Sequence, residues 1–316
     1  MSGGFGHQPV MVAEVVEVLR PVPPGVVVDA TVGGGGHATA LLDELPHIEL
    51  LGLDQDADAI AASRVALERF QGRVSLRQVR FDAIASAMEE VGVDQIAGAL
   101  FDLGVSSPQV DRADRGFSYR TDPGWPDAPL DMRMDQRQPR TAADVVNEAD
   151  ESELARILRT YGDERYASRI ARGIVAARPL TTTGQLVDVI RAAIPAPARR
   201  RGGNPAKRTF QALRIEVNRE LDVLPVALDA VLDRLAPGGR CAVLSYHSGE
   251  DRIVKQRFRE AATGGCTCPP QLPCTCGATP TVRELRPLKR RPTAAEIASN
   301  RRAESAILRA VEKLPA

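Results

Sequence analysis

The stretch "VVVDATVGGGGHATALL", residues Val26 to Leu42, decides the fold class. A run of β-branched residues ends on Asp29, four consecutive glycines follow, and the chain continues with residues that favour helices. This order indicates a short buried strand, a tight turn and a helix. Glycines at such a turn let a ligand approach the backbone at the carboxyl edge of a parallel sheet. The stretch therefore predicts an α/β fold with a ligand site at the turn.

Four further segments continue the alternation of strands and helices. "IELLGLD" (48–54), "RVSLRQV" (73–79) and "IAGALFDLG" (96–104) are typical of strands, and "ADAIAASRVALERF" (57–70) has helical spacing. A series of strands separated by helices is typical of a parallel sheet covered on both faces. We therefore predict a doubly wound sheet.

The alternation stops near residue 105 and resumes near residue 210. The segment between contains amphipathic helical patterns and no strand-like apolar run. After it, residues 210–235 predict one long helix, and "RCAVLSY" (240–246) predicts another buried strand beyond a Pro-Gly-Gly turn. We predict a sheet domain from residues 1–109 and 210–316, with an inserted helical substrate-recognition subdomain over 110–209.

Composition limits the functions that remain. Among 316 residues, 41 Lys and Arg balance 41 Asp and Glu, so any nucleic-acid site must be a local basic patch. No secretory leader or 18-residue apolar run is present in the sequence, which predicts a cytoplasmic protein without membrane association. Five cysteines in a chain of this size do not indicate a disulfide framework.

The glycine turn could hold one of several ligands. A phosphate-binding loop would require a lysine that "GGGGHAT" lacks. Gly33, Gly35 and Ala38 satisfy a dinucleotide spacing, with Asp54 about 20 residues farther on. The arrangement also resembles Rossmann-like S-adenosylmethionine methyltransferases, which place acids at the positions of Asp29 and Asp54. In that comparison Phe81 would lie against the adenine ring.

The segment "FDLGVSSPQVD" (101–111) follows the fourth strand and resembles the short loop with which amino-group methyltransferases hold the acceptor nitrogen at this edge. That resemblance implies an amine as the methyl acceptor. An exocyclic base amine is a poor nucleophile because its lone pair is delocalised into the ring. A carboxylate that accepts a hydrogen bond from the amine would position it and favour the developing charge. Asp102 is the candidate for this catalytic role. Carbon methylation would call for a cysteine nucleophile, and Cys241 lies within a predicted strand, where packing is the expected role.

Six motifs are distributed over nearly the whole chain: "DATVGGGGH" (29–37), "DLGVSSPQVDRADRGFSY" (102–119), "PLDMRMD" (129–135), "TYGDERYASRIARGI" (160–174), "RTFQALRIEVNREL" (208–221) and "SYHSGEDRIVK" (245–255). Together they resemble the signatures of the bacterial small-subunit ribosomal RNA cytosine-N4 methyltransferases, the MraW or RsmH family. The resemblance implies a Rossmann-like class I S-adenosylmethionine-dependent methyltransferase sheet with an inserted all-helical subdomain. It implies methyl transfer to the N4 amine of a cytidine in the decoding region of 16S rRNA, with the small ribosomal subunit as partner. The implied cofactor contacts are Gly35, Gly36, His37, Asp54, Phe81, Asp102 and Gln109.

Basic residues and one histidine add candidates for substrate contact. Flexible basic loops can follow a phosphate backbone, so a cluster at the end of the insertion predicts RNA contacts by Arg199, Arg200, Arg201, Lys207 and Arg208. His247 could take part in catalysis, or it could be a structural residue beside a helix capped by Glu250 and Asp251.

The segment "CTCPPQLPCTC" (266–276) contains four cysteines, Cys266, Cys268, Cys274 and Cys276. These C-x-C pairs are more closely spaced than the C-x-x-C pairs of the usual zinc knuckle. A structural zinc ion is therefore kept only as an alternative to a loop without metal. We expect the chemistry to need no metal.

Two other functions stay open, together with the state of assembly. An NAD-dependent oxidoreductase would share the glycine turn, and a non-catalytic RNA-binding assembly factor would share the basic loop. A homodimer is also compatible with the sequence.

Overall fold

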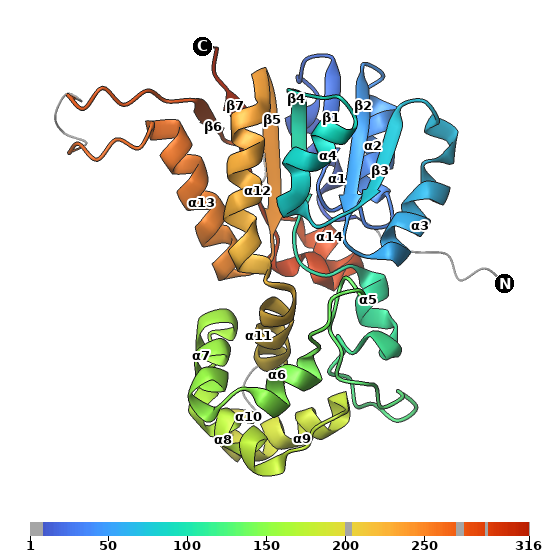
Figure 1. Ribbon diagram of the computed structural model, residues 1–316, viewed down its shortest axis with the longest axis vertical. Helices are drawn as coiled ribbons and strands as arrows, with labels where there is room; N and C mark the ends of the chain where they lie inside the picture. The colour runs from blue at the N-terminus through green and yellow to red at the C-terminus, as the bar shows by residue number, and fades with distance from the viewer. Residues whose placement is uncertain (1–8, 200–203, 270–274, 288–289, 316) are drawn as a thin grey trace. The chain divides into compact units, whose positions relative to one another are not determined.

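The computed structural model describes residues 9–199, 204–269, 275–287 and 290–315 (Figure 1). The chain divides into two compact units, one from residues 1–104 and 221–316 and the other from residues 105–220. The predicted domain boundaries, after residues 109 and 209, fall inside the second unit because helix α11 (Lys207–Asn218) packs against helix α7 (Glu151–Gly162) there. The expected substrate-recognition role of this unit stays a prediction.

The first unit contains a seven-stranded sheet with the order β3-β2-β1-β4-β5-β7-β6. Neighbours among the first five strands pair parallel, and β7 runs antiparallel to both β5 and β6. The strands are β1 (Gly25–Asp29), β2 (Ile48–Asp54), β3 (Val74–Gln78), β4 (Ile96–Asp102), β5 (Leu235–Ser245), β6 (Val282–Leu285) and β7 (Ile307–Lys313). The orange and red strands from the end of the chain complete the sheet begun by the blue and cyan strands (Figure 1). The predicted Rossmann-like fold with a helical insertion is confirmed.

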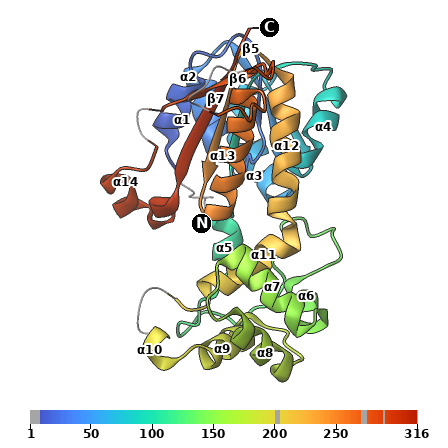
Figure 2. The ribbon, with the colours of Figure 1, turned by 90° about the vertical axis from the view of Figure 1, so that its left-hand side faces the viewer.

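Both faces of the sheet are buried, because successive residues of each central strand enter different cores. Val27 and Leu50 belong to one core, whereas their neighbours Val28 and Leu51 belong to the other. Helices α1 (Val12–Leu19) and α2 (Gly36–Glu44) contribute to the first core, as does Ile60 of α3 (Ala57–Ala66). The second core includes side chains of α4 (Ile84–Glu90), α12 (Glu220–Arg234) and α13 (Ser248–Thr263). Figure 2 shows α1 and α2 on the opposite side of the sheet from α4 and α12.

The expected Pro-Gly-Gly turn is a bulge within strand β5. Ile96 pairs with Leu235, and Gly98 pairs with Arg240, so residues 236–239 lie opposite Ala97 alone. The strand therefore begins earlier than the apolar run predicted, and its pairing with β4 resumes at Arg240.

The single long helix expected over residues 210–235 is wrong. Helix α11 ends at Asn218, and α12 begins at Glu220. Arg219 between them has a φ of 54°, in the left-handed region that interrupts a helix. No glycine or proline stands at this point to indicate the break.

The second unit is helical and has a core of its own. In addition to α7 and α11 it contains α5 (Ser107–Asp111), α6 (Ala142–Glu148), α8 (Ala167–Ala177), α9 (Thr183–Ala193) and α10 (Ala196–Arg199). The buried side chain of Asn218 accepts a hydrogen bond from the backbone N–H of Met134 at 2.8 Å. Its amide also donates to the carbonyls of Met132, at 2.8 Å, and Arg214, at 2.9 Å. The motifs "PLDMRMD" and "RTFQALRIEVNREL" are thus joined inside this unit, as part of its framework.

Helix α14 (Ala294–Ser299) completes the helices of the first unit. Within the described ranges, no helix is long and apolar enough to cross a membrane.

Candidate functional site

Three carboxylates stand at the ends of three adjacent strands. Asp29 ends β1, Asp54 ends β2 and Asp102 ends β4. Tyr246 follows β5, the next strand in the sheet. Because these strands are parallel, all four residues lie at the carboxyl edge, where folds of this type bind ligands. The cofactor and catalytic roles of these residues stay predictions.

Asp54 connects the glycine turn to the loop after β2. Its Oδ2 accepts a hydrogen bond from the backbone N–H of Gly33 at 3.0 Å, and its Oδ1 accepts one from Asp56 at 2.9 Å. Gly35 precedes helix α2 with a φ of 81°, and an added Cβ would lie 3.3 Å from that of Ala66. A side chain at position 35 would therefore be both strained and crowded. The hydrogen bond to Gly33 keeps the turn close to the sheet edge, and the crowding at position 35 requires a glycine there.

Asp29 is a buried carboxyl group without a full set of partners. Its side chain is 1% exposed, and Oδ1 accepts a hydrogen bond from the backbone N–H of Thr31 at 3.2 Å. Within the described ranges, Oδ2 has no hydrogen-bond partner. Burial raises the pKa of Asp29 to about 7, and burial likewise raises the pKa of Asp54 to about 6. Perturbed carboxyls at a strand edge are typical of functional sites.

Asp102 is held from several sides. Its backbone N–H donates to Oγ1 of Thr31 at 2.7 Å, and the hydroxyl of Tyr246 donates to its Oδ1 at 2.6 Å. Its Oδ2 lies 3.5 Å from Nε2 of His37, a distance that suits an ion pair better than a hydrogen bond. Burial and the neighbouring Asp102 raise the pKa of Tyr246 well above its ordinary value, so the hydroxyl keeps its proton.

His37 lies in the first turn of α2 and is buried, with 6% of its surface exposed. Burial lowers the pKa of His37, but the contact with Asp102 and the charges of Asp29 and Glu296 outweigh it and leave the pKa above its ordinary value. The surrounding acids thus favour the protonated form of His37.

Glu296 of α14 was not predicted as part of this site. It accepts a hydrogen bond from the backbone N–H of Met11 at 2.6 Å, and its charge acts on both His37 and Tyr246. No local motif marks it, because its neighbours in space come from the opposite end of the chain.

His247 is the N-terminal cap of helix α13. Its Nδ1 accepts hydrogen bonds from the backbone N–H groups of Gly249, at 3.2 Å, and Glu250, at 3.4 Å. In return, Glu250 accepts from the backbone N–H groups of Tyr246 and His247. This reciprocal arrangement is a capping box. It favours the structural interpretation of His247 over the catalytic one.

The other predicted cofactor contacts are distributed over both units. Gly36 begins α2 beside the turn, and Phe81 follows β3 and packs edge-to-face on Phe101 with ring centroids 5.9 Å apart. Gln109 belongs to the helical unit, where its side-chain oxygen accepts a hydrogen bond from the backbone N–H of Ser106 and caps α5. Cofactor contacts by these residues stay predictions.

The predicted RNA-binding residues lie in and beside two helices of the second unit. Arg199 ends α10, whereas Arg200 and Arg201 lie outside the described residues. Lys207 and Arg208 are exposed in the first turn of α11, and Arg208 donates to the carbonyl of Asp163 at 2.7 Å. Of the cysteine cluster, Cys274 also falls outside the described residues.

Comparison with known proteins establishes the family. The family model described as the MraW methylase family matches residues 4–314 of this chain. The chain belongs to the MraW methylase family. This methylase is 53% identical to ribosomal RNA small subunit methyltransferase H of Heliobacterium modesticaldum, over 98% of this chain and 99% of that protein. Proteins with the same name from Thermobifida fusca and Mycobacterium tuberculosis are 51% and 50% identical. These alignments cover 97% and 98% of this methylase and 93% and 81% of the respective relatives.

Among solved structures, a ribosomal RNA methylase from Streptococcus thermophilus aligns with a TM-score of 0.43 at 12% identity, over 98% of this chain and 99% of the other. That similarity is too low to bear on the assignment. Family membership by sequence makes the methylase a methyltransferase and argues against the NAD-dependent oxidoreductase alternative.

Proposed function

We propose that this methylase transfers a methyl group from S-adenosylmethionine to the exocyclic N4 amine of a cytidine in the decoding region of 16S rRNA. The names of its relatives support ribosomal RNA of the small subunit as the substrate class. The choice of nitrogen and of position follows from the resemblance of the sequence motifs. The acceptor on this proposal is the RNA within the small ribosomal subunit, in the cytoplasm. A homodimer stays a prediction.

The acidic edge of the sheet suits a positively charged ligand. When bound, S-adenosylmethionine supplies a methyl group on a positively charged sulfur. Burial leaves Asp29 with one unpartnered oxygen and a pKa of about 7, so a cation nearby would stabilise its charged form. Asp54 retains lone pairs beyond its backbone hydrogen bonds, and these could accept from ribose hydroxyls. Phe81 offers an apolar ring at the end of β3.

Asp102 carries the proposed chemistry at the acceptor. Its carboxylate accepts a hydrogen bond from the exocyclic amine, which holds the amine in position and favours the positive charge that develops on nitrogen. The same carboxylate then takes the proton that the amine loses. Tyr246 fixes the orientation of the carboxylate through Oδ1. The single observation that carries this proposal is Asp102 at the strand edge, hydrogen-bonded to Tyr246 and close to His37, with Asp29 and Asp54 at the ends of β1 and β2.

The first experiment measures the reaction itself. The purified methylase is incubated with methyl-labelled S-adenosylmethionine and with undermethylated small subunits, stripped 16S rRNA or DNA, and the products are digested to nucleosides. We expect label in N4-methylcytidine from the small subunits. Label in another nucleoside would contradict the proposed acceptor, and cofactor binding without label in any acceptor would favour the assembly-factor alternative.

The second experiment tests Asp102. We expect Asp102→Asn to lower kcat by about 10²-fold, because a neutral amide neither takes the proton nor balances the charge on the amine. Tyr246→Phe keeps the carboxylate and removes one hydrogen bond, so it should lower kcat by only about tenfold. Single-turnover rates at saturating cofactor make the comparison. Methylation by Asp102→Asn at the wild-type rate would exclude the catalytic role and leave the cofactor proposal standing.

A further inference from the structure

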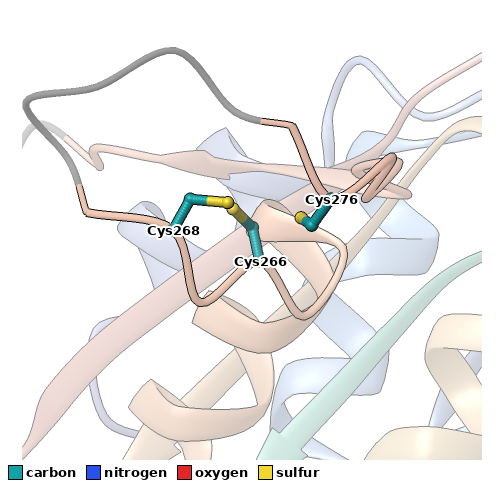
Figure 3. Close-up of side chains that lie close together, drawn as sticks. All are labelled: Cys266, Cys268 and Cys276. Carbon is teal, nitrogen blue, oxygen red and sulfur yellow. The ribbon is translucent and has the colours of Figure 1, made fainter.

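Three cysteine thiols come together at the end of helix α13. Cys266 and Cys268 follow this helix, and Cys276 lies on the segment that returns toward β6. The sulfur atoms of all three lie within 4.8 Å of one another. Figure 3 shows Cys276 directed toward the other two side chains. All three residues are partly or fully exposed, so they do not form part of an apolar core.

Backbone contacts hold the two segments of this loop together independently of the thiols. The backbone N–H of Thr281, on the returning segment, donates to the carbonyl of Ala261 in α13 at 2.9 Å. Within the outgoing segment, the backbone N–H of Cys266 donates to the carbonyl of Thr263 at 3.1 Å. Gly264 ends the helix with a φ of 60°, and an added Cβ there would lie 2.4 Å from the carbonyl oxygen of Thr279. The outgoing and returning segments are therefore in close contact beside the three cysteines.

We propose that Cys266, Cys268 and Cys276 bind one zinc ion. In a tetrahedral site with Zn–S bonds of about 2.3 Å, sulfur atoms lie roughly 3.8 Å apart, a distance inside the 4.8 Å within which these three sulfur atoms lie. Thiolates select soft or borderline cations such as Zn²⁺ over Mg²⁺ and Ca²⁺. On binding, the three thiols release their protons to solvent, and a water molecule or a further side chain takes the fourth position. No electron transfer is involved.

The zinc site is structural and separate from the methyl-transfer site. Helix α13 begins just after the carboxyl end of β5 and has 16 residues, so its far end lies about 24 Å along the helix from that edge. The ion would close the loop between α13 and β6, which pairs with β7 at the margin of the sheet. Its removal should reduce stability and leave cofactor binding unchanged.

The test is the zinc content of the full-length protein, purified under reducing conditions and exposed to zinc before gel filtration. We expect about one equivalent of zinc by elemental analysis. Cys266→Ser and Cys276→Ser should each lose it, whereas Thr267→Ala, in the same loop, and Cys241→Ala, buried in β5, should retain it. Cobalt should give thiolate-to-metal charge-transfer absorption in the wild type and in the two controls only.

A stability measurement gives an independent readout. A chelator should lower the Tm of the wild type and leave that of Cys276→Ser unchanged, because only the folded wild type binds the ion. Absence of zinc from the reduced wild type, retention of zinc by Cys266→Ser and Cys276→Ser, or a Cys266–Cys268 disulfide in the freshly purified protein would each overturn the proposal.

Discussion

At the scale of single residues, Asp29 shows how the candidate site lowers stability. A buried carboxyl with an unpartnered oxygen is unfavourable when charged, and this raises its pKa to about 7 from an ordinary value of 3.8. The folded protein therefore holds a proton that the unfolded chain releases. The stabilising contribution of this proton on Asp29 is fully present below about pH 4 and is lost as the pH rises through 7. Functional sites often retain such unfavourable groups.

Replacement of Asp29 by Asn should stabilise the protein at alkaline pH. Asn cannot ionise, so we expect the free energy of unfolding to rise by roughly 1–4 kcal/mol near pH 8, with a smaller gain near pH 5. Urea denaturation at the two pH values measures the difference. Asp94→Asn, at an exposed position, is the matched control and should show no such trend. An equal gain for Asp29→Asn at both pH values would contradict the burial argument.

The same change should weaken the binding of a positively charged cofactor. Calorimetric titration of the wild type should show tighter binding of S-adenosylmethionine as the pH rises through 7, since the charged form of Asp29 attracts the cation. Asp29→Asn should bind more weakly and without that dependence. A pH dependence that persists in Asp29→Asn would assign it to another group.

At the scale of elements, the sequence is informative where burial is complete. Strand β2 was predicted with its observed bounds because it is a continuous apolar run. Strands β6 and β7 were missed, since β6 has four residues and Arg309 and Glu312 interrupt the apolar residues of β7. The break at Arg219 was missed because a left-handed arginine leaves no mark on helical periodicity.

The candidate site, like the fold, was predictable only in part. The acids at strand ends were predictable because parallel strands bring their carboxyl ends to one edge. The partners of those acids depend on tertiary packing, as the hydrogen bond from Tyr246 to the distant Asp102 shows.

Asn218, at the break between two helices, should be important for the stability of the helical unit. Asn218→Ala leaves the buried backbone groups of Met132 and Met134 without their partner, at an expected cost of about 2–4 kcal/mol. Asn204→Ala removes one local hydrogen bond to Ala206 and should cost about 1 kcal/mol. Urea denaturation compares the two, and hydrogen exchange should accelerate at the Met134 amide. Equal costs would mean that Asn218 has no special role.

At the scale of the whole molecule, the chain has no net charge, so attraction to RNA must come from local clusters. Lys207 stands in the first turn of α11, where a cation is unfavourable for the helix itself. That placement supports a role for Lys207 in contacting the phosphate groups of RNA.

Lys207→Ala should weaken binding to 16S rRNA and reduce the slope of log K against log salt by roughly one. Filter binding over a salt series measures both. Lys255→Ala, which removes an exposed lysine from α13, should leave the slope unchanged. If the two variants show the same slope, the basic segment before α11 does not contact the phosphate backbone through Lys207.

The hydrogen bond between Tyr246 and Asp102 joins residues 144 positions apart in the chain. During synthesis at about 5–20 residues per second, β4 leaves the ribosome roughly 7–30 seconds before β5 can pair with it. The helical unit is made in that interval and has its own core. During this interval the newly synthesised part of the sheet has an unpaired edge at β4. Asp102 and Tyr246, which would act on the ribosome, meet only after the ribosome has synthesised most of the chain.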